Sequence, residues 1–335
     1  MSGSNGEKSV LADSHGRRID YARISITDRC TFRCIYCMPR EGEPPVPHEE
    51  ILRYEEILRL TAIMTGLGVT RFKVTGGEPL CRKGCAPFIA SLKARPGVTS
   101  VTLTTNGAFL ERVLPELVTA GLDSLTVSLD AFSQETHERM TGGTASLKGI
   151  FASMEEAAKS GIRVKINMVP IKGLNDHEIL PLARYALERG YQIRFIELMP
   201  IGKGVSYDPQ PGSETRRMIE SLGSLTQLAE KTGNGPARCA SVEGYPGTVG
   251  FISAVSDAFC AECNRIRLTP VGFLKTCLHH GHGVSLKEAL RGGASDDEIA
   301  AAITQAVKAK PLAHAFAEQK ASGRETSFSM HSIGG

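Results

Sequence analysis

Three cysteines stand close together near the beginning of the chain, in the run CTFRCIYC. Cys30, Cys34 and Cys37 are spaced C-x3-C-x2-C, and three thiolates on one short loop can bind three irons of a cubane iron–sulfur cluster. The next cysteine along the chain is Cys81, so one iron would keep an open coordination position, as catalytic metal sites generally do. Zinc is the alternative, but zinc sites usually take four ligands in CxxC-like pairs. The spacing therefore predicts an iron–sulfur centre that can bind a substrate.

A second group of cysteines lies in the last quarter of the chain. Cys260, Cys263 and Cys277 are spaced C-x2-C-x13-C. Nearby histidines can complete a four-ligand zinc site, because zinc accepts nitrogen and sulfur donors. These histidines are His279, His280 and His282. Spacing alone leaves open whether this group binds zinc or a second cluster.

Two arginines follow the second group, in the run NRIRL. Arg265 and Arg267 are alternate residues, so on a strand both guanidinium groups face the same side and can enter one pocket. A guanidinium suits bidentate binding of phosphate. Without the neighbouring cysteines, two solvated strand arginines would be the simpler interpretation. The remaining cysteines are expected to be buried or incidental thiols: Cys81, Cys85 and Cys239.

Composition limits the classes of protein to consider. At 335 residues the chain is long enough for one large domain, or for a barrel-sized domain with a smaller appendage. A formal charge of +3 is too small to predict nucleic-acid binding. The N-terminal segment lacks the apolar core of a secretory signal, and no apolar run reaches membrane-spanning length. We therefore expect a cytoplasmic protein with reduced thiols, associated neither with nucleic acid nor with a membrane.

Up to residue 200 the sequence alternates β-rich runs with amphipathic helical patterns. Strands are predicted over 21–27, 71–77, 101–107, 124–130, 164–170 and 192–200. Helices are predicted over 54–68, 110–121, 147–161 and 176–190. This alternation predicts right-handed βαβ units and a parallel sheet. Six units are too few for a closed eight-stranded barrel, so we expect an α/β fold with an open, curved, partial (β/α)6 TIM-like barrel over 1–200.

In such folds the chemistry gathers at the carboxyl ends of the strands, and the unusual residues follow those ends here. The first cysteine loop follows the first predicted strand, and Gly76, Gly77 and Glu78 follow the second. Residues 201–335 form a C-terminal extension carrying the second cysteine group. In it we predict a helix over 216–231, β structure over 244–256, a helix over 296–308 and a polar tail ending in Gly-Gly.

The runs CTFRCIYC and TGGEP together resemble the radical S-adenosylmethionine superfamily. That resemblance implies a partial (β/α)6 barrel and a [4Fe-4S] cluster whose open iron is chelated by S-adenosylmethionine. It also implies that the cofactor supplies the difficult chemistry, as a 5′-deoxyadenosyl radical, while the protein orients it and excludes quenchers.

Nearly the whole chain is similar to the GTP 3′,8-cyclase family of molybdenum-cofactor biosynthesis. The motifs that carry the similarity are ISITDRCTFRCIYCMP, TGGEPL, LTTNG, VSLDA, GLND, RFIELMPIG, FCAECNRIRLTPVGFLKTCL and the terminal Gly-Gly. The resemblance implies a lyase with a second three-cysteine [4Fe-4S] cluster that meets the guanine of GTP. Thr31, where the family more often has Asn, departs from the pattern. So do His279 and His280, where an apolar or aromatic residue is common.

The family's functional positions transfer to this chain residue by residue. The cluster ligands would be the six cysteines of the two groups. The residues matching contacts to S-adenosylmethionine are Tyr36, Gly77, Ser128 and Met199. Those matching contacts to GTP are Arg23, Lys73, Thr104, Lys165, Arg265 and Arg267, with Arg71 and Arg194 as further candidates. The resemblance also implies that Gly334 and Gly335 enter the active site, where only residues without side chains fit.

The resemblance also implies partners. These are GTP as substrate, an electron donor of the flavodoxin or ferredoxin type, and a downstream cyclic pyranopterin monophosphate synthase; a homodimer is a further expectation. Two other functions are alternatives. One is another radical enzyme with an auxiliary cluster, such as a peptide-modifying maturase, although these usually carry more cysteines and no terminal Gly-Gly. The other is a non-catalytic, zinc-binding interaction protein.

Overall fold

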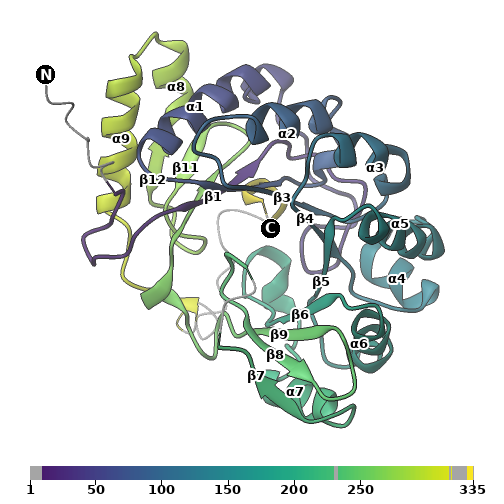
Figure 1. Ribbon diagram of the computed structural model, residues 1–335. Coiled ribbons are helices and arrows are strands. Elements are labelled where there is room, and N and C mark those ends of the chain that lie inside the picture. The colour runs from purple at the N-terminus through teal and green to yellow at the C-terminus, as the bar shows by residue number, and fades with distance from the viewer. Residues whose placement is uncertain (1–9, 230–232, 317, 319–329, 335) are drawn as a thin grey trace, which may run out of the picture.

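The computed structural model describes residues 10–229, 233–316, 318 and 330–334. Within these residues twelve strands form one sheet, in the order β12-β11-β10-β1-β2-β3-β4-β5-β6-β9-β8-β7. Figure 1 shows the sheet curving around a central space, with helices α1 to α6 along its outer side. Among the described helices none is long and apolar enough to cross a membrane.

Strands β1 to β6 follow one another in chain order and are all parallel. Their bounds are β1 (Tyr21–Ser25), β2 (Arg71–Thr75), β3 (Ser100–Thr105), β4 (Ser124–Ser128), β5 (Arg163–Met168) and β6 (Gln192–Ile196). Each overlaps a strand predicted from the sequence. The mixed α/β fold with a parallel sheet is therefore as expected.

The alternation of residues along these strands separates the core from the interior of the curve. On β1 and β2, Ala22, Ile24, Phe72 and Val74 belong to the hydrophobic core beneath the helices. The intervening residues point the other way because successive side chains on a strand face opposite sides. Burying one such aliphatic or aromatic side chain stabilises the fold by about 1.5–3 kcal/mol. The apolar half of each strand thus fixes the register that sends its polar half inward.

The helices between the strands close the outer layer. Their bounds are α1 (Tyr54–Gly66), α2 (Cys85–Lys93), α3 (Leu110–Thr119), α4 (Gln134–Thr141), α5 (Leu147–Lys159) and α6 (Ile179–Glu188). Helices α2 and α4 were not predicted from the sequence. Helix α4 is strongly polar and is defined instead by its ends: Ser133 accepts a bond from the Thr136 N–H, and Gly142 adopts the left-handed conformation that ends it.

Residues after 200 extend both edges of the same sheet. Strand β9 (Thr248–Ile252) pairs in parallel with β6, and β10 (Arg265–Leu268) pairs in parallel with β1. The other elements are α7 (Gly212–Glu220), β7 (Leu225–Gln227), β8 (Arg238–Val242), β11 (Phe273–Lys275), β12 (Gly283–Ser285), α8 (Leu286–Arg291), α9 (Asp296–Lys308) and α11 (Met330–Ile333). Strands on both sides of the expected boundary at residue 200 therefore share one sheet.

The helix predicted over 216–231 was wrong in its second half. Helix α7 ends at Glu220, and β7 pairs with β8 further along the chain. Gly223 allows this turn, because a Cβ on it would lie 2.5 Å from the Glu243 carbonyl oxygen. Lys231 lies outside the described residues. Helix α9, in contrast, has the predicted bounds and begins with a reciprocal capping box between Ser295 and Glu298.

Candidate active site

The inner side of the curved sheet lines a cavity of about 400 Å³, called here the central cavity. Each of the six parallel strands contributes a polar side chain to it. These residues, in strand order, are Arg23, Lys73, Thr104, Thr126, Lys165 and Arg194. They occupy the inward positions left by the apolar alternation. One polar wall is therefore built from strands that begin far apart in the sequence.

The first cysteine group lies at the carboxyl end of β1, and all three of its thiols line the central cavity. The loop is held by backbone bonds, from the Cys37 N–H to the Cys34 carbonyl at 2.8 Å and from the Ile35 N–H to the Met140 carbonyl at 3.0 Å. Burial raises the pKa of the Cys37 thiol to about 12, and the nearby Cys30 adds to that rise. Three mutually close thiols facing one cavity fit a cubane cluster.

No three His, Cys, Asp or Glu side chains in the described part of the chain converge on a single metal ion. A cubane does not require such convergence, because each of its thiolates binds a different iron. The three thiols of the first group share one wall of the central cavity and do not converge on one point.

The double glycine after β2 lets the cysteine loop approach closely. A Cβ on Gly77 would lie 2.5 Å from the Arg29 carbonyl oxygen and 2.7 Å from that of Asp28. The Glu78 N–H donates to the same Arg29 carbonyl at 2.7 Å. Any side chain at Gly77 would therefore displace the loop that carries the cysteines. The resemblance implies that Gly77 contacts S-adenosylmethionine, and the structure shows that this glycine accommodates the neighbouring backbone.

Glu78 connects the loop after β2 to the end of β3. Its buried carboxylate accepts hydrogen bonds from Thr105 Oγ1 at 2.7 Å and from the Asn106 N–H at 2.6 Å. Burial raises its pKa to about 7, although these bonds act in the opposite direction. Asn106 in turn donates from Nδ2 to Thr31 Oγ1 at 3.0 Å and toward Cys30 Sγ at 3.7 Å. The sequence assigned no role to Asn106, which connects this network to Cys30 of the first cysteine group.

The wall of the central cavity is strongly cationic. Burial lowers the pKa of Lys165 to about 8, and the nearby Arg194 contributes to that shift. Burial and the charges of Arg194 and Arg23 hold the pKa of Lys73 well below its usual range. Two carboxylates, Asp123 and Asp130, also line the cavity. Lys93 contacts Asp123 at 2.5 Å, and Tyr36 contacts Asp130 at 2.6 Å.

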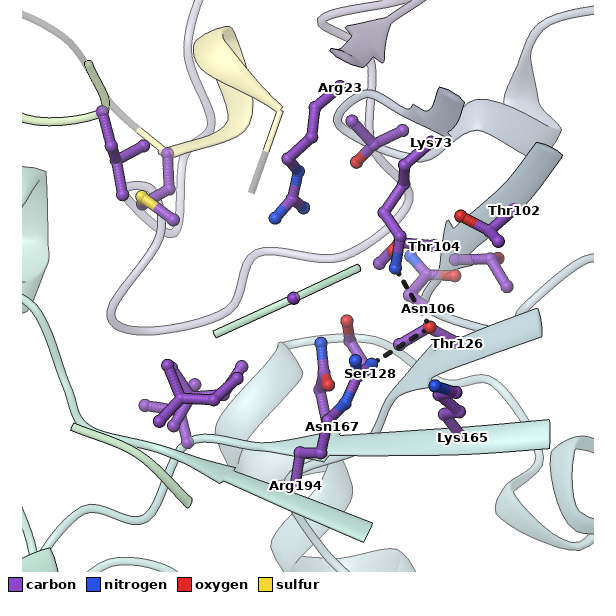
Figure 2. Close-up of a pocket in the computed structure, with 18 of the residues that line it drawn as sticks. Arg23, Lys73, Thr102, Thr104, Asn106, Thr126, Ser128, Lys165, Asn167 and Arg194 are labelled. Carbon is purple, nitrogen blue, oxygen red and sulfur yellow. Dashed lines mark hydrogen bonds between the residues drawn. The ribbon is translucent and has the colours of Figure 1, made fainter. Parts of the chain in front are cut away.

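Figure 2 shows Lys73 and Arg194 converging on Thr126. Lys73 Nζ and Arg194 Nη2 both donate to Thr126 Oγ1, at 3.2 and 3.1 Å. Among the described residues, Thr104 Oγ1, Asn167 Oδ1 and Arg194 Nε are buried with no hydrogen-bond partner. Buried polar groups are normally satisfied, and buried like charges repel one another. A polar, polyanionic ligand would relieve both conditions.

The residues expected to contact S-adenosylmethionine are Tyr36, Gly77, Ser128 and Met199. All four line the central cavity. Of the residues expected to contact GTP, Arg265 and Arg267 line it together with the four that come from β1, β2, β3 and β5. Arg194, a further candidate, also lines it. Arg71 does not line the central cavity and instead donates to Asp20 at 3.0 Å.

The second cysteine group lies at the edge of the central cavity. Its own thiols are not among the lining residues, but their neighbours Phe259 and Leu278 are. Burial alone would raise the pKa of Cys263, yet the positive charges of Arg265 and Lys310 outweigh it and lower that pKa to about 7. Arg265 Nη2 lies 3.9 Å from Cys263 Sγ. Cys263 is therefore predisposed to carry a thiolate.

Two residues from distant parts of the chain hold this region together. Arg17, before β1, donates to the Cys260 carbonyl at 2.7 Å and to the Pro311 carbonyl at 2.7 Å. Lys310, after α9, donates to the Arg265 carbonyl at 3.0 Å. Neither was singled out from the sequence, because nothing near Arg17 or Lys310 in the chain marks a contact so distant in sequence.

The histidines after Cys277 lie beside the C-terminal segment. His279 packs edge-on against His280 and Phe316, with ring centroids 4.7 Å apart in both cases. His280 Nε2 lies 3.0 Å from the Ala313 carbonyl oxygen. These rings thus form part of the packing between the third cysteine and the segment that follows α9.

The C-terminal tail reaches the carboxyl ends of β1 and β2. Arg267 Nη1 donates to the Gly334 carbonyl at 2.7 Å. Gly334 adopts a left-handed conformation, and a Cβ on it would lie 2.8 Å from Thr75 Cγ2 and 3.0 Å from Ser25 Cβ. Only glycine fits there. Gly335 lies outside the described residues.

Comparison with known proteins now gives this site its class. Residues 24–186 match the Radical SAM superfamily, and residues 191–316 match the family described as Molybdenum Cofactor Synthesis C. The solved structure of Streptococcus suis SuiB bound to S-adenosylmethionine is similar in fold, with a TM-score of 0.59 at 13% identity. That match covers 82% of this chain, which spans 65% of the SuiB chain. The fold is that of a radical SAM protein.

Curated relatives narrow the class. A Heliobacterium modesticaldum protein is 43% identical over 91% of this chain and 94% of its own length. Proteins of Clostridium perfringens strain 13 and Syntrophomonas wolfei are 38% and 41% identical, each over 97% of this chain and all of their own length. All three are named GTP 3′,8-cyclase. The chain belongs to the GTP 3′,8-cyclase family.

Proposed function

We propose that this chain is a GTP 3′,8-cyclase, a lyase that converts GTP to 3′,8-cyclo-7,8-dihydro-GTP in molybdenum-cofactor biosynthesis. Family membership at 38–43% identity supports the reaction. One structural observation carries the proposal for the site. A single cavity is lined by the first cysteine group and also by Arg265 and Arg267, which follow the second. Both reactants would therefore meet in one enclosure.

We assign the first [4Fe-4S] cluster to Cys30, Cys34 and Cys37, whose thiols fit it as described. When bound, the cluster and S-adenosylmethionine supply a 5′-deoxyadenosyl radical. The surrounding residues orient the cofactor: Gly77 keeps the loop close, and Tyr36 is fixed by Asp130 at 2.6 Å. Ser128 and Met199 complete the proposed contacts on the same wall.

We assign GTP to the cationic part of the central cavity. Its phosphates would lie among Arg23, Lys73, Lys165, Arg265 and Arg267, and Thr104 offers a buried hydroxyl without a partner among the described residues. Enclosure of the ribose and the guanine in one pocket makes closure of the bond between C3′ and C8 effectively unimolecular. The protein's contribution is therefore to bind, orient and exclude water.

The second [4Fe-4S] cluster is assigned to Cys260, Cys263 and Cys277. A lowered pKa at Cys263 favours the thiolate that a metal requires. Because Phe259 and Leu278 line the central cavity, a group held by this loop would face the guanine side of the substrate. Gly334 and Gly335 would complete the site, with Arg267 shared between the tail and the nucleotide.

The finer architecture belongs to the same proposal. Residues 1–200 form the partial (β/α)6 barrel, and residues 201–335 form the region that bears the second cluster and the tail. An electron donor of the flavodoxin or ferredoxin type would serve the first cluster, and a cyclic pyranopterin monophosphate synthase would consume the product. A homodimer is also proposed.

The decisive experiment is anaerobic incubation of the reconstituted protein with GTP, S-adenosylmethionine and a reductant. We expect 5′-deoxyadenosine and a cyclised nucleotide in equal amounts, with about eight irons and matching sulfide per chain. GTP deuterated at C3′ should transfer deuterium to 5′-deoxyadenosine. Cleavage of S-adenosylmethionine without that transfer would point to another radical enzyme, such as a peptide maturase. Zinc without sulfide would overturn the enzymatic proposal altogether.

A further inference from the structure

A second cavity of about 790 Å³ lies at the opposite end of the parallel strands from the first cysteine group. It is lined by Asp20, which precedes β1, and by the first residues of β2, β5 and β10, which are Arg71, Arg163 and Arg265. Residues 233–238 and several residues between 258 and 264 form its other wall. This cavity is called here the basic mouth.

The basic mouth and the central cavity share a wall. Residues 233–236 line both cavities, and so do Arg163, Phe259 and Arg265. A Cβ on Gly233 would lie 2.9 Å from Lys165 Nζ, so this segment reaches the cationic wall of the central cavity. The two cavities are therefore adjoining chambers separated by one short segment and a few side chains.

The charge of the mouth favours an anion. Five arginines line it against two acids, Asp20 and Glu262. Asp20 is engaged by Arg71 at 3.0 Å and by the Asn264 amide at 2.7 Å. Arg18 and Arg163 are exposed at its rim. The positive charge continues inward through Arg265 to Lys165 and Arg194, so the potential becomes more attractive to an anion along the path.

The other end of the central cavity is occupied by the chain itself. The first cysteine loop lies there, and Met330 and His331 of the tail line the cavity beside it. His331 Nε2 lies 3.4 Å from Glu43 Oε2, and Gly334 is held by Arg267. An approach from this side meets the tail and the site assigned to S-adenosylmethionine.

We propose that the basic mouth is the access route of the nucleoside triphosphate, which reaches the central cavity from the end opposite to S-adenosylmethionine. This inference rests on the proposed function, because it takes GTP as the substrate. The arginines at the rim attract the phosphates, and the path between the chambers runs past residues 233–236, which line both. By this route the nucleotide reaches the cationic wall without passing the first cysteine loop and the tail.

Obstruction of the passage tests the route sterically. Gly235 does not adopt the left-handed conformation, and a Cβ on it would meet nothing within 4 Å among the described residues. Gly235→Trp is therefore expected to fold and to fill the passage. The matched control is Gly212→Trp at the start of α7, which is equally open and does not line either cavity. Iron content and thermal unfolding establish that both variants are intact.

Binding rates are measured by rapid filtration of radiolabelled GTP and of radiolabelled S-adenosylmethionine, without reductant. Gly235→Trp should slow GTP association at least tenfold and leave S-adenosylmethionine association unchanged. Gly212→Trp should change neither rate. Unaltered GTP association in an intact Gly235→Trp protein would overturn the route, and so would an equal slowing of both reactants.

Charge reversal at the rim tests the route electrostatically. Arg18→Glu should slow GTP association several-fold at low ionic strength, and the difference should vanish in high salt because exposed charges are then screened. Arg217→Glu, whose side chain is 72% exposed on α7, changes the net charge equally and should have little effect. Equal effects of the two reversals would overturn the route. Failure of the wild-type protein to bind GTP would instead overturn the proposed function.

Discussion

The two cysteine groups offer the same number of thiols in opposite electrostatic surroundings. At the first group, burial raises the pKa of Cys34 well above its usual value, and Asp130 and the neighbouring thiols add to the rise. At the second group, Arg265 and Lys310 reverse the effect of burial and bring the pKa of Cys263 to about 7. One group is surrounded by acids and other thiols, and the other by cations.

This difference suggests a division of labour between the groups. Thiols must lose their protons to bind metal, so cluster assembly is coupled to pH. At the first group, burial and the nearby acids raise the pKa of the thiols and so favour their protonated form until a metal binds. The cations at the second group favour negative charge, which suits a site beside a triphosphate. The two groups can therefore be separated experimentally.

The largest expected effect comes from removing one ligand from each group. Cys34→Ser should abolish both cleavage of S-adenosylmethionine and cyclisation, because the first cluster is needed for the radical. Cys263→Ser should abolish cyclisation but leave reductive cleavage of S-adenosylmethionine measurable as 5′-deoxyadenosine. Each variant should retain roughly half of the iron, about four per chain. Loss of cleavage in both variants would show that the two groups do not act separately.

Removing Gly334 and Gly335 should also abolish cyclisation, with both clusters retained. Gly334 lies beside Thr75 and Ser25 at the ends of β2 and β1, and Arg267 donates to its carbonyl. Iron, sulfide and cleavage of S-adenosylmethionine should stay near wild-type values while the cyclised nucleotide disappears. Gly334→Ala is the finer version, because its Cβ would clash with the strand ends. Wild-type turnover in the truncated protein would contradict the assigned role.

Arg265→Ala should weaken binding of GTP but not binding of S-adenosylmethionine. Loss of a charged hydrogen-bonding partner of a phosphate costs about 1.5–3 kcal/mol, which corresponds to roughly ten- to hundredfold weaker GTP binding. Binding of S-adenosylmethionine should change little. Calorimetric titration with each reactant distinguishes the two effects. Arg189→Ala, which removes an exposed pair with Glu155 on the outer surface, is the control. Unchanged GTP affinity would remove Arg265 from the site.

Arg17→Ala should reduce the stability of the second cysteine group and leave that of the first group unchanged. The substitution removes bonds to the Cys260 and Pro311 carbonyls and leaves Asp13 buried without its partner. Breaking a buried pair in this way destabilises a protein by about 3–5 kcal/mol. On mild heating, the second group should lose its iron before the protein unfolds globally. Iron analysis during the heating measures this loss. Arg59→Ala, which breaks an exposed pair with Asp296, should cost less than about 1 kcal/mol.

Much of the fold could be predicted because its signals are local. Alternation along β1 to β6 and the 3.6-residue period of α1, α3, α5 and α9 are visible in short windows. Helix α4 was not predicted because it has few apolar residues. Strand β7 was not predicted because nothing within its own three residues indicates its pairing with β8. Nor did the sequence reveal that β9 and β10 continue the parallel sheet at its two edges.

The residues of the site also differ in whether a local sequence signal marks them. The two cysteine groups could be singled out because the spacing of cysteines is a property of the sequence. Arg17 and Lys310 could not, because Arg17 lies 243 residues from Cys260 and Lys310 lies 45 residues from Arg265 along the chain. The second function of Gly77 was equally hidden, since the Arg29 carbonyl that it accommodates becomes its neighbour only in the folded chain.

The smallest expected effect concerns the pH dependence of GTP binding at Lys165. Burial and the nearby Arg194 lower the pKa of Lys165 to about 8. The ammonium is therefore charged below about pH 8 and loses its charge as the pH rises through that value. Because the charged form attracts phosphate, GTP affinity should fall severalfold between pH 7 and pH 9.5. Lys165→Arg, which stays charged throughout this range, should flatten the dependence while S-adenosylmethionine binding follows the same profile in both proteins. The same decline in the arginine variant would place the titrating group elsewhere on the cationic wall.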